Sequence, residues 1–132
     1  MSFETVKKFE KIIAAFFSAP YAVAVDSCTH GIELSLRYMK VNKIKVPVRT
    51  YISIPFLAHK LDISLEWNKE EWNDFYYLSE KVIDAAVLWE KDSYIPGTYM
   101  SLSFQYQKHL SLGRGGIILC PDIDSFNQLK KM

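Results

Sequence analysis

Four places in the sequence join chemically useful polar side chains to the end of an apolar run of strand length. These groups are Ser27-Cys28-Thr29, Thr50-Tyr51, Asp84, and Ser103 followed by Lys108. In sheets covered by helices, ligands bind beyond the carboxyl ends of the strands. We therefore expect these residues to gather at one edge of a sheet and to form a site there.

The first group lies between an apolar run and the start of an expected helix. The amide groups of a helix start, together with the hydroxyls of Ser27 and Thr29, suit an anion such as phosphate. Local sequence alone favours a simpler interpretation, in which Ser27 or Thr29 only caps the helix. Both interpretations remain open at this point.

Asp84 and Lys108 are the two candidate charged groups. Asp84 interrupts the apolar run 81–88, where a carboxylate is costly to bury without a partner. A buried carboxylate suits a protonated ring nitrogen, and the alternative is an Asp that caps the end of a strand. Lys108 precedes a glycine-rich turn and could supply the amine of a Schiff base, whereas most lysines are solvated surface groups.

Other kinds of site are poorly supported by the residue spacing. The glycines within 113–116 match neither a dinucleotide-binding pattern nor a P-loop, and they suit a tight turn instead. The three histidines and two cysteines lack metal-ligand spacing, so no metal site is predicted. No carboxylate pair or elbow-type serine indicates hydrolysis.

The elements that must position the four groups alternate between helices and strands. Apolar periodicity and capping residues predict helices at 3–17, 32–39, 52–58 and 69–78, and from Asp122 or Asp124 through Leu129. Apolar runs predict strands at 21–25, 44–48, 61–65, 81–86, 99–104 and 116–120. Strands that are apolar throughout indicate a mainly parallel sheet covered by helices, and no linker or repeat divides the chain. We therefore expect one α/β domain over residues 1–132.

Composition narrows the class of protein. The chain has 132 residues, of which 49% are hydrophobic and 14% aromatic, so it can bury a real core and is not disordered. A net charge of +1 argues against a nucleic-acid partner. The two cysteines show no spacing typical of a disulfide framework, and the amino end has no apolar signal core. No apolar run is long enough to span a membrane. These features predict a cytoplasmic protein without a membrane partner.

The motifs, taken in chain order, form a recognisable series. They are Phe9-Glu10, Ser27-Cys28-Thr29, Thr50-Tyr51, Asp84-Ala85-Ala86, Ser103-Phe104 with Lys108, and Gly113-Arg114-Gly115-Gly116. This order resembles the large domain of the DegT-type, fold type I sugar aminotransferases, which depend on pyridoxal 5′-phosphate (PLP). The resemblance spans Phe9 to about Met132, and Ser-Phe-x-x-x-Lys before Gly-x-Gly-Gly is its most specific part.

The resemblance implies a shortened version of that family's large domain, with PLP as the cofactor. It implies that Lys108 is the Schiff-base lysine and moves protons between substrate and cofactor. Asp84 would pair with the pyridinium nitrogen and keep it protonated. Tyr51 would stack on the face of the cofactor ring. The phosphate would be held by Ser27, Cys28, Thr29 and Ser103.

The implied activity is transfer of an amino group, from glutamate, to a nucleotide-linked keto-sugar. The site would be completed by a second copy in a homodimer or by a partner chain, because the family's small domain is absent. The sequence departs from the family at Val87, where Gln or His is usual, and between Glu66 and Lys81, where a strand and a helix are missing. These departures favour an alternative, an impaired cofactor-binding or interaction protein, or one half of a split aminotransferase.

Overall fold

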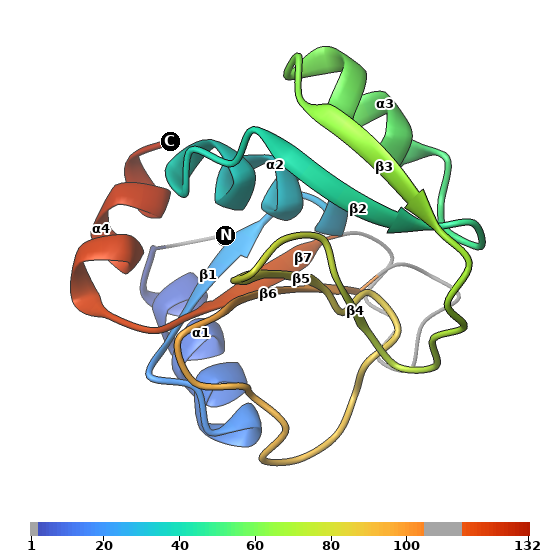
Figure 1. Ribbon diagram of the computed structural model, residues 1–132. Coiled ribbons are helices and arrows are strands. Elements are labelled where there is room, and N and C mark those ends of the chain that lie inside the picture. Colours follow the sequence, from blue (N-terminus) through green and yellow to red (C-terminus); the bar gives the residue numbers. More distant parts are fainter. Residues whose placement is uncertain (1–2, 105–114) are drawn as a thin grey trace.

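The computed structural model describes residues 3–104 and 115–132 and contains four helices and seven strands within those ranges (Figure 1). In chain order the elements are α1 (Phe3–Phe17), β1 (Tyr21–Val25), α2 (Cys28–Tyr38), β2 (Lys43–Pro47), α3 (Ser53–Lys60), β3 (Ser64–Asn68), β4 (Tyr76–Tyr77), β5 (Val82–Asp84), β6 (Tyr99–Ser103), β7 (Gly116–Cys120) and α4 (Ile123–Lys131). The expected bounds of the first helix and of the strands at 21–25 and 116–120 are confirmed. The α/β character is confirmed as well.

The main sheet has five strands in the order β1-β7-β6-β5-β4. Its strand directions are mixed, because β5 pairs with β6 in parallel while the other three pairings are antiparallel. The expected mainly parallel sheet is therefore wrong in this detail. An apolar run indicates that both faces of a strand are buried, but it does not indicate the direction of the strand. An antiparallel strand that is covered by helices on both faces has the same apolar pattern as a parallel one.

Helices cover both faces of the main sheet, and alternate residues of each strand serve each face. Figure 1 shows α1 on one side of the sheet and α2 on the other. Ile117 and Leu119 of β7 pack in the cluster that contains α1 residues Ile13 and Phe17. Ile118 faces the opposite way and packs with Leu34 of α2. In the part of the chain that the structure describes, no helix combines the length and apolar character needed to cross a membrane.

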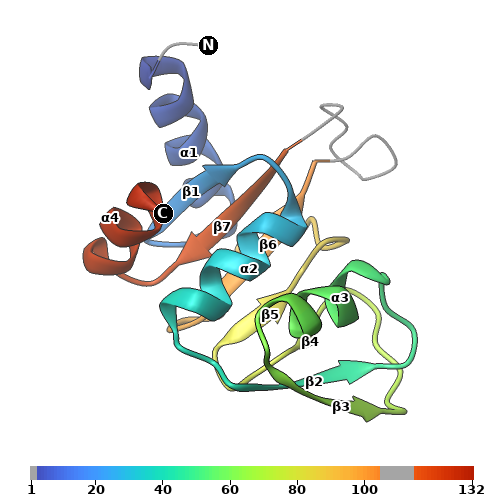
Figure 2. The same ribbon diagram turned by 90° about the horizontal axis from the view of Figure 1, so that it is seen from above.

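A second, two-stranded sheet lies beside the main one and consists of β2 and β3 in parallel. Figure 2 shows this pair together with α3 at the end of the molecule remote from β1. The Lys45 amide of β2 donates to the Leu78 carbonyl at 2.9 Å. This bond connects the small sheet to the chain that leaves β4.

The helix expected at 69–78 does not form, and the short strand β4 lies there instead. Trp72 and Tyr76 are four residues apart, which imitates a helical face, and their rings do pack at 4.8 Å. However, Phe75 belongs to the apolar cluster on the α1 side, while Trp72 and Tyr76 belong to a cluster on the other side. A strand sends neighbouring residues to opposite faces, so this division favours the extended conformation.

Glu10 of α1 is buried, with only 3% of its surface exposed, against the edge strand of the main sheet. Its carboxylate accepts a hydrogen bond from the Ala24 amide of β1 at 2.7 Å and another from Lys130 Nζ of α4 at 2.7 Å. An edge strand has backbone donors that its own sheet cannot satisfy. Glu10 therefore links α1 and α4 to the edge strand β1.

Replacing Glu10 should destabilise the fold through this backbone bond. Glu10→Ala should lower the free energy of unfolding by about 2 kcal/mol, because the partly buried Ala24 amide then has no acceptor. Glu10→Gln keeps an acceptor and should lose less, and Glu4→Ala, exposed on the same helix, is the control. Urea unfolding measures all three, and equal losses for Glu10→Gln and Glu10→Ala would contradict the assignment.

Candidate functional site

Three strands of the main sheet run in the same direction, although β7 and β4 run the opposite way. β1 is antiparallel to β7, β7 is antiparallel to β6, and β6 is parallel to β5. β1, β5 and β6 therefore place their carboxyl ends at one edge of the sheet. Asp84 and Ser103 are the last residues of β5 and β6, and Ser27 follows β1 by two residues.

A cavity of about 220 Å³ lies at this edge. Its lining contains five of the seven residues that the sequence marked as a site. The complete lining is Cys28, Thr29, Ile32, Tyr51, Ile52, Ser53, Ile54, Asp84, Ala86 and Ser103. Residues up to 75 positions apart in the chain thus meet around one small space.

Ser27 lies beside this cavity as the cap of α2. Its backbone is extended, and its hydroxyl accepts a hydrogen bond from the His30 amide at 3.1 Å. The capping interpretation therefore describes the Ser27 side chain. A well-formed cap also fixes where the first turn of the helix points, which is toward the cavity that Cys28 and Thr29 line.

One end of the cavity carries the groups that suit an anion. The amino end of α2 supplies amides and the positive end of the helix dipole. The Thr29 hydroxyl lies 3.1 Å from the hydroxyl of Ser53, and Ser103 lines the same space. Ser53 was missed in the sequence, where its position two residues after Thr50-Tyr51 was the available signal.

Asp84 brings a buried carboxylate to the cavity, with 5% of its surface exposed. Its Oδ1 accepts from the Ala86 amide at 3.1 Å, and its Oδ2 accepts from the Tyr76 hydroxyl at 2.6 Å. The bond to Ala86 is the local cap that the sequence allowed. The bond from Tyr76 was not foreseen, because it depends on the pairing of β4 with β5.

Gly115 and Gly116 explain why the sequence needs glycine at the start of β7. Gly115 has φ of +112°, which side chains disfavour. A Cβ on Gly116 would lie 2.7 Å from the Cys28 amide nitrogen and 2.7 Å from the Leu102 carbonyl oxygen. Since these are backbone atoms, β7 can approach the start of α2 only with glycine at 116.

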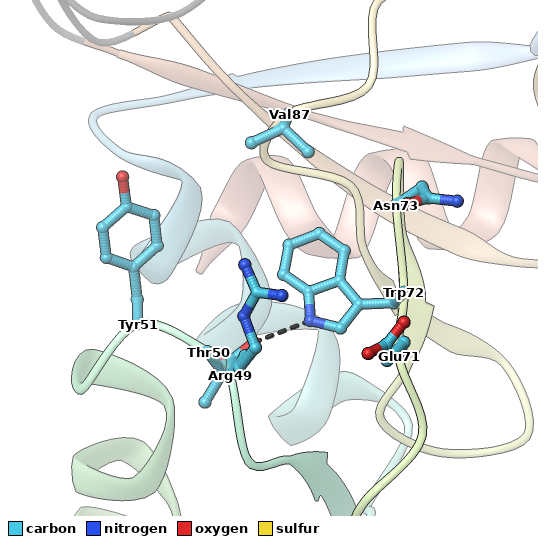
Figure 3. A pocket seen from close by; sticks show the side chains of 7 residues that line it. All are labelled: Arg49, Thr50, Tyr51, Glu71, Trp72, Asn73 and Val87. Carbon is cyan, nitrogen blue, oxygen red and sulfur yellow. Dashed lines mark hydrogen bonds between the residues drawn. The ribbon is translucent and has the colours of Figure 1, made fainter.

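A second, wider pocket of about 590 Å³ adjoins the cavity and shares Tyr51 with it. Figure 3 shows the residues that line it, which are Arg49, Thr50, Tyr51, Glu71, Trp72, Asn73 and Val87. The Trp72 indole donates to the Arg49 carbonyl at 2.6 Å, the dashed line in the figure. Tyr51 is 54% exposed, so its ring forms part of the wall between the two spaces.

Lys108, Gly113 and Arg114 lie outside the described residues. Over residues 3–104 and 115–132, no three His, Cys, Asp or Glu side chains come together as metal ligands. Cys28 and Cys120 are both buried thiols that form no disulfide. Burial raises the pKa of Cys120 to about 12, so that thiol is unreactive.

The resemblance seen in the motifs is confirmed over the first part of the chain. Residues 1–60 match the model of the DegT/DnrJ/EryC1/StrS aminotransferase family. No curated protein matches the sequence.

Solved structures extend the likeness to nearly the whole chain. 3-Amino-5-hydroxybenzoic acid synthase is 20% identical with a TM-score of 0.73, and the match covers 96% of this chain and 45% of that one. DesI, solved with its TDP-sugar product, is 13% identical with a TM-score of 0.77 over 98% and 44%. A protein of Streptococcus pneumoniae described as a sugar aminotransferase, in its PLP form, is 16% identical with a TM-score of 0.75 over 96% and 48%.

These likenesses establish the fold, a shortened version of the fold type I aminotransferase architecture. The chain spans about half the length of the solved structures it matches, with coverage of 44% to 48% in the three cases above. The expected architecture was therefore correct, apart from the mixed strand directions and the absence of a helix at 69–78.

A methyl group at residue 116 should disturb the cavity through the backbone. Gly116→Ala should lower the free energy of unfolding by about 1–3 kcal/mol, because the added Cβ overlaps the backbone at Ser27-Cys28. Gly31→Ala is the matched control, since its Cβ would meet only side-chain atoms, at 3.0 Å and beyond, within a helix. Urea unfolding of both variants tests this, and a larger loss for Gly31→Ala would refute it.

Proposed function

We propose that this chain is the cofactor-binding domain of a PLP-dependent sugar aminotransferase. The observation that carries the proposal is the gathering of Cys28, Thr29, Tyr51, Asp84 and Ser103 around one cavity. The resemblance assigned these residues to a single cofactor. The match of residues 1–60 to an aminotransferase family supports the same activity.

The chemistry of the cavity fits PLP at three points. Amides and hydroxyls at the amino end of α2 suit a phosphate group. The buried carboxylate of Asp84 suits a protonated ring nitrogen, because a buried charge requires an opposite one. Tyr51 offers an aromatic face to the same cavity, and Ile32 and Ile54 offer apolar walls.

PLP, when bound, supplies an electron sink that eases proton removal beside an amino group. The protein's part is to hold and orient it. Asp84 keeps the ring nitrogen protonated, Ser27 fixes the helix start that meets the phosphate, and Thr29 and Ser103 donate to its oxygens. Lys108 binds the cofactor through its amine and moves protons at the substrate carbon.

The substrates we propose are a nucleotide-linked keto-sugar as acceptor and glutamate as amino donor. A structural neighbour solved with a TDP-sugar product supports the sugar class. The pocket of about 590 Å³ beside Tyr51 offers space for a group larger than the cofactor. A second copy of the chain, or a partner chain, would complete the site.

A second candidate is a protein that binds PLP without completing amino transfer, alone or as half of a split enzyme. The observation that favours it is Val87, which lines the wider pocket where the family has a hydrogen-bonding Gln or His. A valine side chain can donate no hydrogen bond to the cofactor. Binding would then survive while turnover is lost.

Absorbance of the purified chain with added PLP tests the proposal. We expect a protein-bound cofactor band shifted from that of free PLP, and its loss in Lys108→Ala. Lys91→Ala is the control, because that lysine is exposed on the surface and does not line the cavity. Protein that stays colourless and takes up no PLP would overturn the proposal.

Adding glutamate to the loaded protein separates the two candidates. An aminotransferase should lose the band as the amino group passes to the cofactor. A binding protein should keep the band unchanged until a partner chain is supplied.

A further inference from the structure

The Asp84 carboxylate is held by a tyrosine from a part of the chain that lacked any predicted role. Tyr76 lies directly opposite Asp84 in the antiparallel pairing of β4 with β5. Its hydroxyl donates to Asp84 Oδ2 at 2.6 Å. Tyr76 itself is 9% exposed, so the bond lies in a dry environment, where hydrogen bonds to charged groups are strongest.

The direction of the hydrogen bonds around Tyr76 follows from counting protons. The hydroxyl of Tyr76 has one hydrogen, and Asp84 takes it as a carboxylate. The Thr50 hydroxyl, which lies 2.5 Å from the same Tyr76 oxygen, must therefore be the donor in that contact. Thr50 donates to Tyr76, and Tyr76 donates to Asp84.

The pKa of the Tyr76 phenol favours the protonated, hydrogen-bond-donating form. Burial raises the pKa of its phenol well above the ordinary value, and the negative charge of Asp84 raises it further. The phenol thus keeps its proton whenever Asp84 is ionised. The bond between them does not switch off near neutral pH.

The ring of Tyr76 is fixed from outside as well. Trp72 packs on it with ring centroids 4.8 Å apart, and the Trp72 indole is anchored on the Arg49 carbonyl. Arg49 immediately precedes Thr50. The segment Arg49-Thr50 therefore contacts Tyr76 in two ways. Arg49 binds the Trp72 ring that packs on Tyr76, and Thr50 donates a hydrogen bond to the Tyr76 hydroxyl.

We infer that Tyr76 is a positioning residue that orients the Asp84 carboxylate toward the ring nitrogen of the cofactor. The inference rests on the proposed function, because the ring nitrogen is PLP's. The Ala86 amide holds Oδ1 while Tyr76 holds Oδ2, so the carboxylate cannot rotate without breaking a bond. Held in this way, the carboxylate lies in the wall of the cavity.

Affinity for two related ligands tests this inference. The probes are PLP and its analogue in which the ring nitrogen is replaced by C–H. Tyr76→Phe should weaken PLP binding about tenfold, the effect of losing one hydrogen bond to a charged group. The same variant should bind the analogue as tightly as the wild type does, because the analogue makes no demand on Asp84.

Two further variants separate positioning from a general loss of structure. Tyr94→Phe is the matched control, since that partly buried hydroxyl donates to the Thr98 carbonyl at 2.7 Å outside the cavity, and it should leave both affinities unchanged. In an Asp84→Asn background, Tyr76→Phe should change PLP affinity by less than about twofold. Thr50→Val should weaken PLP but not the analogue, and it tests the inference if Tyr76→Phe does not fold.

The outcomes are distinguishable from those of the proposed function. Wild-type protein that binds no PLP defeats the proposed function and this inference together. Wild-type protein that binds PLP while Tyr76→Phe binds it equally well defeats the inference alone. Equal weakening toward PLP and the analogue also defeats it, because it shows that Tyr76 only supports the fold.

Discussion

The packing of β7 against the start of α2 is the constraint on which the candidate site depends. Gly116 stands opposite Val25 of β1 and opposite Ser103 of β6 in the sheet. One residue of an antiparallel strand thus touches the carboxyl ends of two strands that run the other way. Because it has no side chain, the backbone of Ser27 and Cys28 can lie against it. The amino end of α2 is placed over the sheet edge by this contact, and the cavity lies where the two meet.

The sequence predicted correctly those elements whose apolar pattern matches the surfaces that they bury in the fold. The helix at 3–17 and the strands at 21–25 and 116–120 have the expected bounds, because their apolar residues face the sheet or the covering helices. The cavity also collects most of the expected site, although the sheet is mixed. Predicting the cavity required only that β1, β5 and β6 run in the same direction. They do so because β7, which lies between β1 and β6, is antiparallel to both.

The failures came from contacts that no local pattern contains. The aromatic residues of 69–78 have helical spacing, yet they divide between two faces of the sheet and form β4. The direction of each strand could not be predicted from its apolar run, because parallel and antiparallel strands can be equally buried. Tyr76 and Ser53 were missed as site residues because each reaches the cavity region through tertiary packing, and neither stands in a motif.

The two readings of Asp84, a cap and a functional carboxylate, are compatible in the structure. A carboxylate with 5% exposure is costly unless its oxygens are met by donors. The Ala86 amide meets one oxygen as a local cap does, and this bond is available to any Asp at a strand end. The Tyr76 hydroxyl meets the other from β4, in the segment where a helix was expected. The two bonds together fix the orientation of this carboxylate, and the short strand β4 supplies the second donor.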